Sequence, residues 1–92
     1  MEAIRVVVTG RVQGVSYRAY CQDAGRRMGL TGWVRNRRDG SVEAFAQGER
    51  AALDAFTGWC HQGSPSADVT GVTVERVPPD PAVVGFSVRS TA

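Results

Sequence analysis

The hydrophobic period of this chain changes across the segment Thr9–Arg18, and this change limits the folds that the chain can form. Before the segment, Ile4, Val6 and Val8 alternate within a run rich in β-branched residues, which predicts a strand over residues 4–9 that ends at Gly10. After it, apolar residues recur every three or four positions and predict a helix with one apolar face, formed by Tyr17, Tyr20, Cys21, Ala24 and Met28. The chain therefore begins with a strand, a short loop and a helix.

The rest of the chain repeats this alternation. Thr31–Asn36 has the composition of a second strand, and a turn at the Asp-Gly pair leads to its hairpin partner Ser41–Gln47. An apolar stripe at helical spacing predicts a second helix over Glu49–His61. Val69–Val77 alternates as a strand, and a proline-rich segment separates it from a short last strand over Val84–Val88.

This order of elements is β-α-β-β-α-β followed by a short extra strand. It predicts an α+β fold of the ferredoxin-like split βαβ type, with two helices on one face of a mainly antiparallel sheet. At 92 residues with 42% apolar content, we expect a single domain over residues 1–92. Because this fold hosts RNA-binding, metal-binding, regulatory and enzymatic sites, function must be argued from individual residues.

Charge and hydropathy narrow the range of partners. The 11 basic residues are all arginine, and with 9 acidic residues they give a net charge of only +2, too small to indicate nucleic-acid binding. No apolar run is long enough to span a bilayer, and the first residues already resemble a strand rather than a signal peptide. We therefore expect a cytoplasmic protein without nucleic-acid or membrane partners, and by default a monomer.

The two cysteines, Cys21 and Cys60, occupy apolar positions on the predicted helices, and neither has a partner at zinc-ligand spacing. We expect buried, reduced thiols and no metal; a disulfide between the helices is the alternative, which a cytosolic compartment disfavours. Cys21 and Arg27 also match the Cys-x5-Arg spacing of cysteine-dependent phosphatases. Those enzymes need this segment as a loop after a strand, whereas here it lies in a predicted helix.

The loop after the first strand is a candidate anion site. Gly10 and Gly14 allow a tight turn, and backbone N–H groups from about Val12 to Arg18 can then converge on one phosphate beside the helix N-terminus. Arg18 adds a fixed positive charge. The alternative is an ordinary strand-to-helix turn with a surface arginine, which an isolated G-x-x-x-G pattern would favour.

Asn36 is the second candidate, because its amide can both donate and accept hydrogen bonds at the end of the second strand. In a split βαβ sheet that strand end can face the loop after the first strand, even when the two strands are not neighbours. The alternative is a turn-forming asparagine ahead of Arg37, Arg38, Asp39 and Gly40.

Together the two segments resemble the signatures of the acylphosphatase family. Val8–Arg18 resembles the first signature and Gly32–Val42, continuing to Gly48, resembles the second; one departure is Tyr17, where the family usually has phenylalanine. The resemblance covers the whole chain and implies hydrolysis of small acyl phosphates to a carboxylate and inorganic phosphate, without a cofactor. It implies that Asn36 positions the attacking water and that phosphate is held by the loop residues Arg11, Val12, Gln13, Gly14, Val15, Ser16, Tyr17 and Arg18.

The chemistry agrees with the residues at hand. A carboxylate leaving group, whose conjugate acid has a pKa of about 4 to 5, departs with little help from a general acid, so neither a histidine nor a buried acid is needed. We expect a phosphate oxygen of the substrate to take the proton of the water. Two other functions stay open: an RNA-binding module, for which Phe45 is the only aromatic residue on the central strands, and an inactive domain or part of a larger carbamoyl-transferring assembly.

Overall fold

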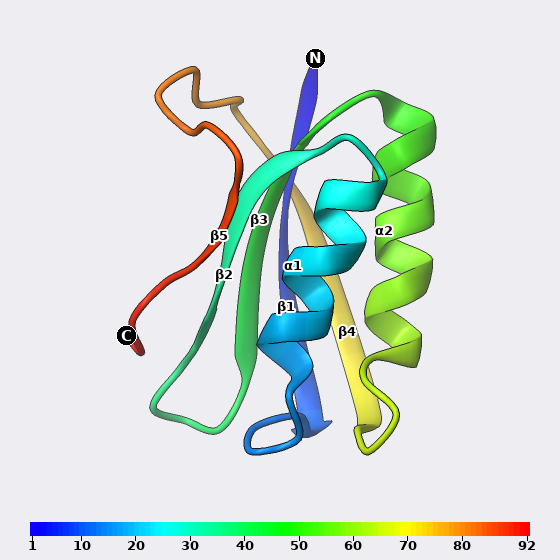
Figure 1. The fold of residues 1–92 in the computed structure, drawn as a ribbon, viewed down its shortest axis with the longest axis vertical. Coiled ribbons are helices and arrows are strands. Elements are labelled where there is room, and N and C mark those ends of the chain that lie inside the picture. The colour runs from blue at the N-terminus through cyan, green and yellow to red at the C-terminus, as the bar shows by residue number, and fades with distance from the viewer.

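The computed structural model describes all residues from 1 to 92. The elements in chain order are β1 (Glu2–Arg11), α1 (Tyr17–Arg27), β2 (Thr31–Asn36), β3 (Val42–Gly48), α2 (Arg50–Gln62), β4 (Asp68–Val77) and β5 (Phe86–Val88). The strands form one sheet in the order β4-β1-β3-β2-β5, in which only β2 and β5 are parallel. Both helices cover the same face of this sheet (Figure 1). The predicted ferredoxin-like α+β fold is confirmed.

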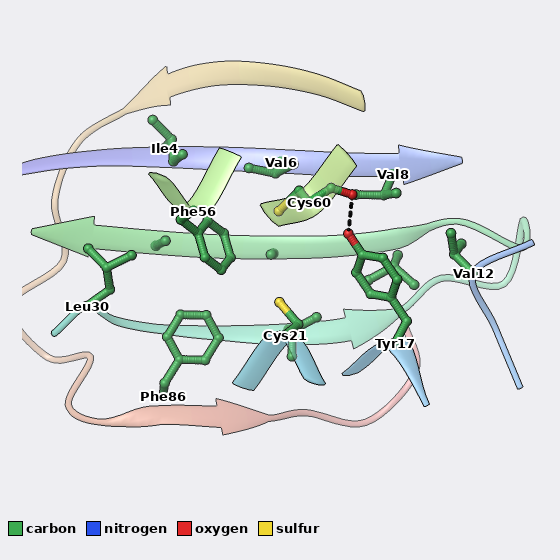
Figure 2. Packing of buried hydrophobic residues seen from close by; sticks show 14 of the residues in the cluster. Ile4, Val6, Val8, Val12, Tyr17, Cys21, Leu30, Phe56, Cys60 and Phe86 are labelled. Carbon is green, nitrogen blue, oxygen red and sulfur yellow. Dashed lines mark hydrogen bonds between the residues drawn. The ribbon is translucent and has the colours of Figure 1, made fainter. Parts of the chain in front are cut away.

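The core lies between the sheet and the two helices (Figure 2). Alternate residues of β1 point into it, as the period of two predicted, and the helices contribute Tyr17 and Cys21 from α1 and Phe56 and Cys60 from α2. Both cysteines are free thiols and fully buried, which confirms the prediction of buried, reduced thiols. Burial raises the pKa of Cys21 and raises that of Cys60 to about 12, so both thiols stay protonated at neutral pH.

The predicted apolar face of α1 was wrong at one position. Tyr20 is 47% exposed, whereas Gly25, which the pattern did not include in this face, is buried directly against the ring of Phe86. A Cβ atom on Gly25 would lie only 2.4 Å from Cδ2 of that ring. The helix therefore turns its smallest residue towards β5, because an aromatic ring fills the space between them.

Two of the differences between predicted and observed strand boundaries affect the packing. The first strand does not end at Gly10 but continues to Arg11, and its pairing with β4 shifts register between Thr9 and Gly10. Gly10 has a φ of 116°, and a Cβ atom there would lie 2.2 Å from the Asp68 carbonyl oxygen, so this irregular pairing requires glycine. At the other terminus, Val84 is 80% exposed and the last strand is shorter than predicted.

The topology brings two separate loops to one end of the molecule. Strand β3 lies between β1 and β2 and is antiparallel to both, so the C-terminal ends of β1 and β2 point the same way. The loop from β1 to α1 and the turn from β2 to β3 accordingly lie at the lower end of the view in Figure 1. The fold thus places Asn36 at the same end of the sheet as the glycine-containing loop.

Candidate active site

The loop between β1 and α1 has an unusual backbone. Gly14 has a φ of 73°, as its predicted role in a tight turn requires, and Ser16 has a φ of 63°, the only positive φ at a non-glycine residue in the chain. Such a conformation costs free energy in an L-residue, and residues of this kind cluster at functional sites. The loop therefore holds Ser16 in a conformation that local preference does not favour.

The N-terminus of α1 is open to an anion. Ser16 occupies the N-cap position, but its side chain makes no capping hydrogen bond, and the first turn of the helix contains no acidic residue. The first N–H groups of a helix have no acceptor within the helix, and they carry a partial positive charge. This helix start is therefore suited to an anionic ligand.

A cavity of about 410 Å³ joins this helix start to the end of β2. Arg18 in the first turn of α1 and Asn36 at the end of β2 both line it. The whole set of lining residues is Val12, Gly14, Ser16, Tyr17, Arg18, Ala19, Asn36 and Val88. One arginine and no carboxylate face this space, so its electrostatic character favours an anion.

The Arg18 and Asn36 side chains, which both line the cavity, lack partners within the protein. Arg18 is half-buried and takes part in none of the ion pairs of the structure. The Oδ1 atom of Asn36 is buried and accepts no hydrogen bond, whereas its backbone carbonyl accepts one from the Ala92 N–H at 3.0 Å. A buried oxygen without a donor is unfavourable, and this one is free to accept a hydrogen bond.

Three of the predicted loop residues lie outside the cavity. Arg11 is the last residue of β1 and pairs with Asp68 on β4, so it belongs to the sheet rather than to the loop. Val15 is buried in the core. The side chain of Gln13 points to the turn between β2 and β3, where its Nε2 donates to the carbonyl oxygens of Arg37 at 2.7 Å and Ser41 at 2.9 Å.

The structure adds three residues that sequence patterns did not indicate. Ala19 and Val88 line the cavity, and Val88 arrives there because β5 pairs in parallel with β2, opposite Val34. Ser64, only 2% exposed, donates a hydrogen bond from Oγ to the Val15 carbonyl oxygen at 2.7 Å and so fixes the peptide that precedes Ser16. The residues around Ser64 have only the composition of a polar loop. A hydrogen bond to Val15, 49 residues away in the sequence, leaves no local pattern that could predict it.

Two other sequence features, the Cys-x5-Arg spacing and Phe45, lie outside the cavity. Cys21 is buried within α1, and Arg27 pairs with the exposed Asp23 at 2.9 Å, so the Cys-x5-Arg spacing does not form a phosphate-binding loop. Phe45 is 8% exposed and stacks on Trp33, with ring centroids 6.1 Å apart.

No cluster of histidine, cysteine and acidic residues with the arrangement of a metal site occurs. Neither helix is long and apolar enough to cross a membrane.

The protein is thus a small α+β protein with one cavity that contains an arginine and an unpartnered asparagine but no carboxylate. Comparison with known proteins identifies the group to which it belongs: the Acylphosphatase family model matches residues 4–88. An acylphosphatase of Anaeromyxobacter dehalogenans is 54% identical over 85 residues, covering 92% of this chain and 91% of the relative. The chain belongs to the acylphosphatase family, and these relatives support an acylphosphatase activity, the hydrolysis of acyl phosphates.

Solved structures agree. The crystal structure of acylphosphatase from Bacillus subtilis superimposes with a TM-score of 0.92 at 38% identity, covering 97% of this chain and 99% of that one. Full-length HypF, in a phosphate- and nucleotide-bound form, gives a TM-score of 0.87 at 23% identity, but the match covers only 12% of that chain. The second likeness shows a shared fold alone.

Proposed function

We propose that this enzyme hydrolyses acyl phosphates by direct attack of water on phosphorus, with Arg18 and the loop amides binding the phosphate and Asn36 positioning the water. One observation carries the proposal: the half-buried Arg18 and the unpartnered Oδ1 of Asn36 line one cavity that contains no carboxylate. The family and the fold support acyl phosphate hydrolysis in general. The separate roles of Arg18 and Asn36, which the resemblance to the family signatures implies, form the finer part of the proposal.

Phosphate binding rests on the loop and the start of α1. The guanidinium of Arg18 has no carboxylate partner, so it is available to hold two phosphate oxygens at once. The amides around Gly14 and Ser16, together with those of the first turn, supply further donors in fixed positions. Such donors stabilise the charge that spreads over the equatorial oxygens in the transition state.

Asn36 acts on the nucleophile. Its Oδ1 accepts a hydrogen bond from the water, which orients an oxygen lone pair towards phosphorus. The water oxygen forms the new P–O bond, and the bond from phosphorus to the carboxyl oxygen breaks, so the carboxylate leaves with the electron pair. Because the cavity contains no histidine and no carboxylate, a phosphate oxygen of the substrate takes the proton.

The proposal extends to the state of the protein. Residues 1–92 act as one domain and as a cytoplasmic monomer, and turnover requires neither a metal nor a cofactor. An arginine and backbone amides already supply the positive charge that a metal ion would otherwise bring to a phosphoryl group.

Phosphate release from benzoyl phosphate by the purified protein, with and without a chelator, tests the function. We expect hydrolysis that is unaffected by the chelator and far slower release from p-nitrophenyl phosphate, whose leaving group is a weaker one. Binding of a fluorescent single-stranded RNA, measured in parallel, tests the alternative. Absence of phosphate release together with tight RNA binding would contradict the proposal.

The site of attack can be tested separately. Hydrolysis in water enriched in oxygen-18 should place the label in inorganic phosphate and none in benzoate, because the proposed nucleophile bonds to phosphorus. Label in the benzoate would mean attack on the carbonyl carbon, and Asn36 would then have a different role.

A further inference from the structure

We propose that Gln13 is a positioning residue that holds the phosphate-binding loop at a fixed distance from Asn36. This inference rests on the proposed function of the loop and of Asn36. It concerns the side chain of Gln13, which does not line the cavity and therefore acts through its neighbours.

The side-chain amide of Gln13 bridges two segments that are remote in the sequence. Its Nε2 donates to the Arg37 carbonyl oxygen at 2.7 Å and to the Ser41 carbonyl oxygen at 2.9 Å. An amide NH₂ group has two protons, so both are used in these bonds. One side chain from the β1–α1 loop thus closes onto both ends of the β2–β3 turn.

The turn that receives these bonds is itself held by internal hydrogen bonds. The Arg37 N–H donates to the Ser41 carbonyl oxygen at 2.8 Å, and the Gly40 N–H donates to the Arg37 carbonyl oxygen at 3.1 Å. The backbone N–H and the hydroxyl of Ser41 both donate to Oδ1 of Asp39, at 2.9 and 2.6 Å. Gln13 therefore attaches the loop to a turn whose backbone is fixed by four hydrogen bonds of its own.

The position of the attachment explains its function. Arg37 directly follows Asn36, and Gln13 directly precedes Gly14, which lines the cavity. The bridge consequently joins the backbone next to the water-positioning amide to the backbone of the phosphate cradle. Rate depends steeply on such distances, since a displacement of about 1 Å can lower it about 100-fold.

The test is a Gln13→Met variant, which keeps the length of the side chain but removes both donors. Gln22→Met is the matched control, because Gln22 is similarly half-buried and its Nε2 donates to the Phe86 carbonyl oxygen at 2.9 Å, outside the cavity. We expect Gln13→Met to lower kcat about 10-fold to 100-fold, with little change in inhibition by inorganic phosphate. Gln22→Met should keep kcat within about twofold of wild type.

A double variant separates positioning from a general loss of structure. If Gln13 acts through Asn36, Gln13→Met should change kcat by no more than about twofold in the Asn36→Ala background. A full multiplicative loss in that background, an unchanged kcat in Gln13→Met alone, or a loss confined to phosphate affinity would each overturn the proposal. Gln13→Asn, one methylene too short to make both bonds, serves if the methionine variant does not fold. Failure of the proposed function would show independently, as an unchanged kcat in the Asn36→Ala single variant.

Discussion

The hydroxyl of Tyr17 donates a hydrogen bond to the carbonyl oxygen of Cys60 at 2.9 Å, and so joins the first turn of α1 to the last turn of α2 (Figure 2). Carbonyls in the last turn of a helix have no donor within the helix, so the phenol satisfies a group that would otherwise be buried without a partner. Burial raises the pKa of Tyr17, which keeps the hydroxyl protonated as a donor. Phenylalanine, which the resemblance to the family signature implies at this position, would lack this bond.

Tyr17→Phe should therefore lower the free energy of unfolding by about 1 to 2 kcal/mol, since it leaves the Cys60 carbonyl oxygen unsatisfied. Urea denaturation measures the change. Tyr20→Phe is the control: this side chain is 47% exposed, and its loss of a hydroxyl should cost less than about 0.5 kcal/mol. Equal stability of both variants and wild type would show that the hydrogen bond contributes nothing.

A pair of glycine substitutions tests the packing of the helices. Gly25→Ala should destabilise the protein by about 1 to 3 kcal/mol, because its Cβ atom would overlap the buried ring of Phe86. Gly58→Ala on the exposed side of α2 meets no atom within 4 Å and should stabilise by about 0.5 to 1 kcal/mol through helix propensity. If Gly25→Ala stabilised the protein as well, α1 would not lie as close to β5 as described.

Ser64→Ala tests whether the loop is held from the side of α2. Removal of Oγ leaves the buried Val15 carbonyl oxygen without its donor, so we expect a loss of about 1 to 2 kcal/mol in stability and a higher KM for benzoyl phosphate. Ser66→Ala, an exposed substitution in the same loop, should change neither quantity. A normal KM in Ser64→Ala would show that the loop keeps its conformation without this bond.

Glu43 makes stability depend on pH. Burial acts to raise the pKa of its carboxyl, but hydrogen bonds from Arg35, at 2.7 Å, and from Arg5 outweigh burial and lower it. A carboxyl with a lowered pKa contributes stability above its unfolded value of about 4.3, and this contribution is lost as pH falls through the folded value.

Glu43→Gln should accordingly cost about 1 to 3 kcal/mol at neutral pH and flatten the decline of stability in acid, as followed by urea denaturation from neutral pH downwards. Glu75→Gln is the matched control, because its side chain is 62% exposed although it also pairs with Arg5. It should cost less than about 1 kcal/mol. An acid limb unchanged in Glu43→Gln would assign the pH dependence to other groups.

Local patterns in the sequence were sufficient to predict the order of strands and helices, because each element buries one face with its own period. They failed where a neighbour remote in the sequence decides the outcome. Gly25 is buried because Phe86 packs against it, and Ser64 and Val88 reach the site region through long-range contacts. Arg11 belongs to β1 rather than to the predicted loop because the irregular pairing at Gly10 lets the strand continue.

The site was predictable to a different degree. Arg18 and Asn36 were candidates from their residue types and positions, but each taken alone was compatible with a turn or a surface role. Arg18 lies just after β1 and Asn36 ends β2, and the sheet order places β3 between these two strands. The approach of the two residues therefore depends on strand pairing that no local window contains. The side-chain hydrogen bonds of Gln13 to Arg37 and Ser41 likewise join residues that are remote in the sequence, so no local pattern predicts them.

The most direct test of the central claim is a comparison of Arg18→Ala and Asn36→Ala in kcat and in inhibition by inorganic phosphate, with benzoyl phosphate as substrate. Arg26→Ala, which removes an exposed and unpaired arginine from the same helix, is the control. We predict that Asn36→Ala loses at least about 100-fold in kcat with phosphate affinity retained, while Arg18→Ala loses at least about 10-fold in phosphate affinity as well as turnover. Full activity in both variants would contradict the account.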